Sequence, residues 1–197
     1  SKVVEVSVIV TTYNWPEALK IVLMGLNAQS YSNFEVIVAD DGSTNETKAL
    51  IEQMAGGVSY PLSHVWHEDK GFRAAAIRNR AAARAAGNLL IFLDGDSVPF
   101  SDFVGKYVRF SEKGFFASGN RILFNRSFTA RVIRESLPVF QWGLVKWVKA
   151  WINRDIKRLL PLFSLPDGGF RKLHTHKWRG VRTCNMACWK SDFYQVN

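Results

Sequence analysis

The stretch Leu89-Leu90-Ile91-Phe92-Leu93-Asp94-Gly95-Asp96-Ser97 decides the fold, because five apolar residues run directly into two acids that one glycine separates. An apolar run of this length is typical of a strand that is buried on both faces. Two carboxylates so close together repel each other, and a divalent cation such as Mg²⁺ or Mn²⁺, which prefers oxygen ligands, would relieve that repulsion. Gly95 allows a tight turn that lets both acids face one point. We expect Asp94 and Asp96 to bind a metal, and the alternative interpretation is an ordinary Asp-Gly surface turn.

Apolar runs and helical patterns alternate on the N-terminal side of this stretch. Strands are predicted at residues 5–11, 34–39 and 63–67, with helices between them that include the alanine-rich segment 72–86. Beyond Asp96, the pattern predicts a helix at 101–112 and one or two strands within 115–124. Repeated strand–helix–strand units predict an α/β fold with a mainly parallel sheet and helices on both of its faces. In such sheets, ligands bind beyond the carboxyl ends of the strands.

The residues at the predicted strand ends point to a nucleotide site of a particular kind. The chain has neither Gly-x-Gly-x-x-Gly after its first strand nor a Gly-Lys-Ser/Thr loop, which argues against a dinucleotide-binding dehydrogenase and a phosphate-loop NTPase. Instead, the aromatic ring of Tyr13 could stack on a base, and the carboxylate of Asp41 could accept hydrogen bonds from a base or a ribose. A metal on Asp94 and Asp96 would then neutralise a diphosphate.

Positive charge is concentrated in the last part of the chain. The formal net charge is +9, but residues 1–120 hold 11 Lys/Arg and 13 Asp/Glu, whereas residues 121–197 hold 15 Lys/Arg and 4 Asp/Glu. An anionic substrate, a membrane surface or a nucleic acid would each suit such a basic segment. Within 131–160, apolar side chains that include Trp147 and Trp151 share one helical face and lysines share another, as in helices that lie at a membrane interface. The alternative is a surface helix whose apolar face packs on the sheet.

Four motifs, in this order and spacing, resemble those of family 2 glycosyltransferases of GT-A fold. They are Val-Ile-Val-Thr-Thr-Tyr-Asn (8–14), Val-Ile-Val-Ala-Asp-Asp-Gly-Ser-Thr (36–44), Ala-Ile-Arg-Asn-Arg-Ala (76–81) and Phe-Leu-Asp-Gly-Asp-Ser (92–97). The segment 71–79 also resembles polymerising and capsule-type bacterial members of the family. The stretch 182–189 is similar to the segment that precedes the acceptor site in those enzymes, with Cys184 in place of the usual glycine.

This resemblance implies a role for each candidate site residue. Thr11 and Tyr13 would line the nucleoside pocket, and Asp41 would hold the base, with Asp40 beside it in support. Asp94 would contact the ribose or the metal, and Asp96 would be the metal ligand on the diphosphate. The resemblance further places Arg78, and less firmly Arg73, near the nucleotide or the acids. The two arginines do not share a helical stripe, so we expect at most one of them to contact the nucleotide directly.

The resemblance also implies the reaction. The family transfers a sugar from a nucleotide-diphosphate sugar, most often a UDP-sugar, with inversion, and bacterial members act on surface glycans or lipid-linked acceptors. Residues 1–120 would form the nucleotide-sugar-binding half and residues 121–197 the acceptor side. In the family, an acid that follows the segment similar to 182–189 acts as general base. We therefore expect the base beyond Asn197 and a truncated C-terminus, with Asp167 and Asp192 as the alternatives within the chain.

We expect a cytoplasmic location, with peripheral contact at the inner membrane. No apolar run is long enough to span a bilayer, no secretory signal is recognised, and Cys184 and Cys188 are expected to be reduced thiols. Two other functions stay open. A metal-dependent nucleotidyltransferase would need a basic phosphate-binding loop after the first strand, and 12–16 contains no Lys or Arg. A non-enzymatic module that binds anionic lipid or nucleic acid through its basic segment is the third hypothesis, with nucleic acid the less favoured partner.

Overall fold

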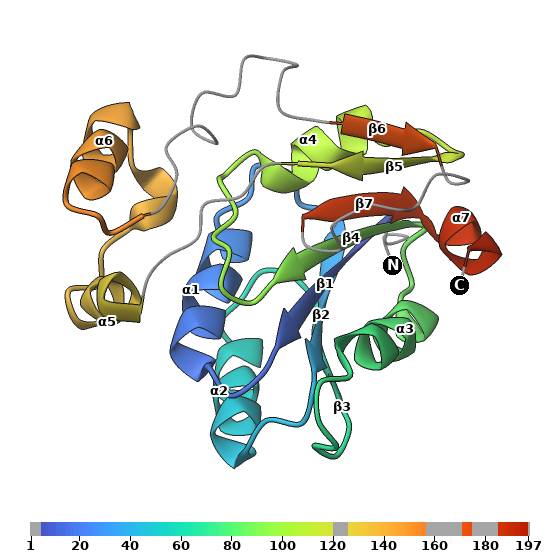
Figure 1. Ribbon diagram of the computed structural model, residues 1–197, viewed down its shortest axis with the longest axis horizontal. Helices are drawn as coiled ribbons and strands as arrows, with labels where there is room; N and C mark the ends of the chain where they lie inside the picture. The colour runs from blue at the N-terminus through green and yellow to red at the C-terminus, as the bar shows by residue number, and fades with distance from the viewer. Residues whose placement is uncertain (1–4, 120–125, 157–170, 175–184, 197) are drawn as a thin grey trace.

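The computed structural model describes residues 5–119, 126–156, 171–174 and 185–196 as one α/β domain (Figure 1). Strands and helices alternate over the first half, as the sequence predicts. In chain order the elements are β1 (Val6–Thr12), α1 (Pro16–Asn27), β2 (Phe34–Asp40), α2 (Asn45–Ala55), β3 (Leu62–Trp66), α3 (Ala74–Arg84), β4 (Leu89–Asp94), α4 (Phe103–Phe110), β5 (Phe115–Ser118), α5 (Arg126–Arg134), the 3₁₀ helix η1 (Val139–Gln141), α6 (Leu144–Ile152), β6 (Arg171–His174), β7 (Met186–Trp189) and α7 (Lys190–Gln195).

The strands form a seven-stranded sheet in the order β3-β2-β1-β4-β7-β5-β6. Neighbouring strands from β3 to β4 are parallel. Strand β7 is antiparallel to both β4 and β5, so β5 runs in the same direction as β4, and β6 is antiparallel to β5. The predicted α/β fold with a mainly parallel sheet is therefore confirmed. The late strand β7 lies between two strands that precede it by many residues, which the sequence did not predict.

Both faces of the sheet are covered by helices, as expected for strands that are apolar throughout. Successive side chains of a strand point to opposite faces. Val8, Val36 and Ile91 pack with apolar residues of α1, α2 and α4 on one face. Ile9 and Phe92 pack with α3 on the other face, where Phe193 of α7 also packs. Each large apolar side chain buried in this way contributes about 1.5–3 kcal/mol to folding.

The helices α5 and α6 form a separate cluster with η1, which we call the α5–α6 lobe (residues 126–156). Its buried side chains include Phe128 and Trp147, and Ile21 of α1 packs into the same cluster. The sequence predicted one amphipathic stretch over 131–160, but α5 ends at Arg134 and α6 begins after Gly143. The interruption contains Ser136 in the left-handed region, with φ of 48°. Residues 157–160 of that stretch lie outside the described residues.

Adjacent strands bring the predicted site residues to one edge of the sheet. Thr12 at the end of β1 is in register with Asp40 at the end of β2, and Thr11 is in register with Asp94 at the end of β4. This carboxyl edge is the place where open α/β sheets bind ligands. Among the described residues, no helix has the length and apolarity that a bilayer crossing requires.

Candidate active site

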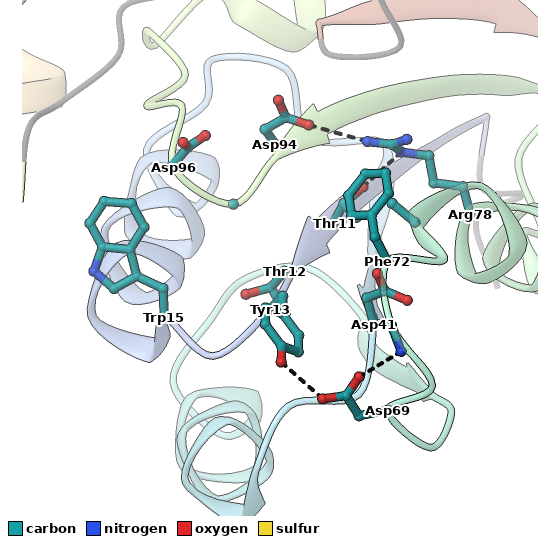
Figure 2. Close-up of a pocket in the computed structure, with 13 residues that line it drawn as sticks. Thr11, Thr12, Tyr13, Trp15, Asp41, Asp69, Phe72, Arg78, Asp94 and Asp96 are labelled. Carbon is teal, nitrogen blue, oxygen red and sulfur yellow. Dashed lines mark hydrogen bonds and ion pairs between the residues drawn. The ribbon is translucent and has the colours of Figure 1, made fainter.

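A pocket of about 430 Å³ opens at the carboxyl edge of the sheet (Figure 2). Six of the seven predicted site residues line it, and the exception is Arg73. The pocket also contains residues that the sequence analysis did not single out, notably Trp15, Asp69 and Phe72. Its complete lining is Thr11, Thr12, Tyr13, Trp15, Asp41, Asp69, Gly71, Phe72, Ala74, Arg78, Asp94, Gly95 and Asp96.

Arg78 joins the end of β1 to the end of β4. Its Nε donates a hydrogen bond to Thr11 Oγ1 at 3.0 Å, and one of its terminal nitrogens lies 3.4 Å from Asp94 Oδ1. Both side chains of this ion pair are largely shielded from solvent, with 15% of Arg78 and 26% of Asp94 exposed. Arg78 therefore has a fixed position beside the acids, as the sequence analysis expected.

Gly95 makes the turn between Asp94 and Asp96 possible. Its N–H donates to the Thr11 carbonyl at 2.7 Å, and a Cβ added to Gly95 would lie 2.7 Å from the same oxygen. A side chain at this position would collide with the backbone of β1, so only glycine allows the approach. The turn leaves Asp94 and Asp96 half-buried at the pocket, as Figure 2 shows.

The donor set of Asp94 and Asp96 fits a divalent cation that is shared with a substrate. Within the part of the chain that the structure describes, no group of three or more His, Cys, Asp or Glu side chains could enclose a metal ion. Mg²⁺ and comparable cations in nucleotide sites commonly take one or two carboxylates and complete their shell with phosphate oxygens and water. Two half-buried carboxylates that face an open pocket match that pattern.

Two consecutive acids end β2, and each one is held by a histidine and a backbone N–H. Asp40 is 0% exposed, lies 2.9 Å from His64 Nε2 and accepts a hydrogen bond from the Ser43 N–H at 2.8 Å. Asp41 lies 2.6 Å from His67 Nε2 and accepts a hydrogen bond from the backbone N–H of Arg73 at 2.9 Å. Only Asp41 of the two lines the pocket.

The rim of the pocket is formed by Tyr13 and the loop that leads from β3 into α3. The Tyr13 hydroxyl donates to Asp69 Oδ2 at 2.9 Å, and Asp69 Oδ1 accepts from the Gly71 N–H at 3.1 Å (Figure 2). The hydrogen bond from Tyr13 holds the pKa of Asp69 below its usual value, and Asp69 in turn raises the pKa of Tyr13. Phe72, which is 92% exposed, completes the apolar side of the rim.

Arg73 supports the site through its backbone. Its backbone N–H donates a hydrogen bond to the Asp41 carboxylate, whereas its guanidinium group turns back and donates to the Glu68 carbonyl oxygen. This turn keeps the Arg73 side chain out of the pocket lining. Of the two arginines, only Arg78 lines the pocket.

Two residues of the C-terminal part lie apart from the pocket. Asp192, an alternative candidate for the general base, is buried and accepts the Gly114 N–H at 2.7 Å. Cys188 in β7 is free and buried, and burial raises the pKa of its thiol to about 12, so it is protonated at neutral pH. Asp167 and Cys184 lie outside the described residues.

His67 is a residue that sequence reasoning missed. It lies directly after the short edge strand β3, and its only sequence signal is a second histidine, His64, three residues earlier. Asp69 and Phe72 follow in the same loop, where no regular pattern predicted a role. These residues become part of the site because the loop folds back closely over Gly42. A Cβ at position 42 would lie only 2.6 Å from the Asp69 Cα, so a glycine is needed there.

A doubly wound α/β domain with acids beyond the ends of β2 and β4, on either side of β1, and with an aromatic rim on its pocket is typical of a nucleotide-binding fold. The chain belongs to the family described as Glycosyl transferase family 2, whose sequence model matches residues 7–169. Its fold is accordingly the GT-A fold of these glycosyltransferases, as the four motifs had indicated.

Individual relatives agree with this assignment. The chain is 38% identical over 106 residues to the hyaluronan synthase of Pasteurella multocida, which covers 53% of this chain and 11% of the relative. It is also 28% identical over 140 residues to WfaP of Escherichia coli, a UDP-Glc:alpha-D-GlcNAc-diphosphoundecaprenol beta-1,3-glucosyltransferase. This alignment covers 70% of this chain and 54% of WfaP. The chain thus spans at most about half of either relative.

A solved structure shares the fold. The mannosyltransferase PcManGT from Pyrobaculum calidifontis, in complex with GDP-Man and Mn²⁺, superposes with a TM-score of 0.52 at 26% sequence identity. The superposition covers 66% of this chain and 38% of PcManGT.

Proposed function

We propose that this chain is the donor-binding part of an inverting glycosyltransferase that takes its sugar from a nucleotide-diphosphate sugar, with UDP as the nucleotide. The observation that carries the proposal is the pocket at the carboxyl edge, where Asp41 and the Asp94–Asp96 pair lie on opposite sides of the end of β1. WfaP is named for a UDP-sugar donor and PcManGT was solved with GDP-Man, which supports a nucleotide-sugar donor here.

Asp41 is the residue proposed to recognise the base. A carboxylate only accepts hydrogen bonds, and a nucleobase such as uracil offers an N–H donor. His67 and the Arg73 N–H already hold the two oxygens of Asp41 in place, so the carboxylate does not need to reorganise when the base arrives. Tyr13 and Thr11 would provide the walls of the nucleoside pocket.

Asp96, together with Asp94, is proposed to hold Mn²⁺ or Mg²⁺. A bound cation would neutralise the charge that develops on the departing diphosphate. Arg78, already 3.4 Å from Asp94, adds a fixed positive charge on the same side of the pocket. The Mn²⁺ in the PcManGT complex supports this choice of metal.

The proposed reaction is a single displacement. The acceptor hydroxyl loses its proton to a general base, its oxygen forms a bond to the anomeric carbon, and the bond from that carbon to the diphosphate oxygen breaks. We propose that residues 1–120 bind the donor and residues 121–197 form the acceptor side. The base is proposed to lie outside the described residues, because Asp192 is buried away from the pocket.

The acceptor is proposed to be a growing glycan or a lipid-linked sugar of a bacterial surface polysaccharide. The names of the relatives support this class, since one is a hyaluronan synthase and another acts on a diphosphoundecaprenol-linked sugar. A lipid-linked acceptor would require the enzyme to work at a membrane surface.

Calorimetric titration of the chain with UDP, with and without Mn²⁺, tests the donor site. Asp96→Ala should reduce the Mn²⁺-dependent affinity for UDP at least tenfold, because the proposed cation loses a carboxylate. Asp102→Ala is the matched control, since Asp102 pairs with Lys106 at 2.8 Å and does not line the pocket. Equal Mn²⁺-dependent affinities in all three proteins would overturn the proposal, and a parallel titration with GDP tests the choice of nucleotide.

A further inference from the structure

Helix α6 is apolar on two opposite sides. Its inner side packs into the α5–α6 lobe through Trp147, which is 1% exposed and donates its Nε1–H to the Trp142 carbonyl at 3.1 Å. On the opposite side, Val145 is 70% exposed and Ile152, two turns later, is 66% exposed. Val148 lies between them and is half-buried. Trp151 borders this outer stripe and is 47% exposed, whereas Trp147, which helical spacing places on the same face, is buried.

Positive charges flank the outer stripe. Lys146 and Lys149 are exposed, and neither forms an ion pair within the described part of the chain. Elsewhere in the lobe, Arg131 is neutralised by Asp155 at 2.6 Å. As far as the described residues show, the two lysines therefore present charge without an ionic partner, beside exposed aliphatic side chains.

The lobe is attached to the rim of the pocket. The guanidinium group of Arg126, the first residue of α5, lies 5.3 Å from the centre of the Trp15 ring, and Trp15 lines the pocket. Ile21 of α1 packs into the core of the lobe. In Figure 1, β1 and β4 point toward the side of the molecule on which α5 and α6 lie. Whatever binds the outer stripe of α6 is thus held on the side of the sheet where the pocket opens.

We propose that the outer stripe of α6 docks on an anionic lipid bilayer. Val145, Val148, Trp151 and Ile152 would enter the boundary between headgroups and acyl chains, and Lys146 and Lys149 would lie at the lipid phosphates. A polyanionic glycan or a nucleic acid would satisfy the lysines but would leave the aliphatic side chains in water. A second copy of the chain on the same stripe would bring lysines against lysines. A bilayer satisfies both parts of the surface.

Docking would bring a lipid-linked acceptor to the side of the molecule on which the donor pocket opens. The biological purpose of the docking therefore rests on the proposed function. The docking itself does not depend on nucleotide binding. Vesicle binding and UDP binding can therefore fail separately.

Co-sedimentation of the 197-residue chain with vesicles tests the proposal, using phosphatidylglycerol mixed with phosphatidylcholine against phosphatidylcholine alone at low salt. The chain should pellet with the anionic vesicles only. Each lysine near an anionic surface contributes about fivefold in affinity, so Lys146→Glu/Lys149→Glu should reduce binding more than about tenfold. Val145→Ser/Ile152→Ser should also reduce binding at least about tenfold, since it removes the inserting aliphatic groups.

Arg80→Glu/Arg84→Glu is the matched control, because it makes the same change in charge on the exposed side of α3. It should change binding less than about threefold, because α3 is not expected to meet the bilayer. Circular dichroism melting establishes that each variant is folded. The proposal is overturned if the unaltered chain stays in the supernatant, if the α3 variant loses as much binding as the α6 variant, or if Val145→Ser/Ile152→Ser has no effect. A dimer in solution that the α6 substitutions dissociate would also overturn it, in favour of self-association.

Discussion

The carboxyl ends of β2 and β4 both present acids at the edge of the sheet, but the acids have different surroundings. At β2, Asp40 and Asp41 are buried, and each holds a histidine ring nitrogen and a backbone N–H. At β4, Asp94 and Asp96 are half-buried around a glycine turn, with the Arg78 guanidinium group nearby. Hydrogen-bond partners on both oxygens fix Asp40 and Asp41 in place, whereas Asp94 and Asp96 face the open pocket, where the proposed function has them take up a cation.

The largest expected effect of a substitution at either strand end is on folding. Asp40→Ala would leave the buried Ser43 N–H without its acceptor and His64 without its partner, so the free energy of unfolding should fall by about 2–4 kcal/mol. Asp96→Ala, at a half-buried position, should lower it by less than about 1 kcal/mol. Urea denaturation measures both changes. Similar decreases in the free energy of unfolding for Asp40→Ala and Asp96→Ala would contradict the proposed difference between the two strand ends.

The second prediction separates the two histidines. His67→Ala should weaken UDP binding about tenfold, because Asp41 loses a partner that orients it toward the ligand. His64→Ala should lower stability but leave the UDP affinity within about twofold, since Asp40 does not line the pocket. His67→Gln, which retains a hydrogen-bond donor, should recover part of the affinity. If His64→Ala weakened UDP binding as much as His67→Ala, the positioning role of His67 would be wrong.

The smallest expected effect concerns the exposed rim. The pKa of Asp69 is lowered in the folded chain, so the stabilisation from its contact with Tyr13 is present above the ordinary carboxyl pKa and is lost as the pH falls through the lowered pKa. Tyr13→Phe should move the pKa of Asp69 part of the way back up, because the Gly71 N–H bond remains. An NMR titration of the Asp69 carboxyl group measures the shift. An unchanged titration would mean that the hydroxyl does not hold Asp69 in solution.

Local patterns predicted the first half of the fold well. The apolar runs that became β1, β2 and β4 are buried on both faces, and such strands are recognisable without knowledge of their neighbours. The insertion of β7 beside β4 could not be predicted in this way. Its four residues pair with a strand almost a hundred positions earlier, and the pairing depends on the whole sheet rather than on local preference.

The same limit applies to the site and to the basic segment. Acids at strand ends were visible in the sequence, but the histidine that holds Asp41 comes from the neighbouring edge strand, and this contact depends on tertiary structure. In the basic segment, helical spacing placed Trp147 and Trp151 on one face. In the structure, Trp147 packs in the core of the lobe, whereas Trp151, one turn later on the same helix, is 47% exposed, and periodicity alone could not distinguish the two.

The place of β7 in the sheet has a consequence for how the protein is made. Strand β4 pairs with β1 on one edge, and its other edge stays unpaired on the ribosome until residues 186–189 have been synthesised. During that interval, the nascent chain exposes the edge of an apolar strand, which is a template for aggregation. A shortened version that ends before Met186 would keep this edge open permanently. The strand that carries Asp94 is therefore vulnerable throughout the synthesis of the whole α5–α6 lobe, and the arrival of β7 ends that period.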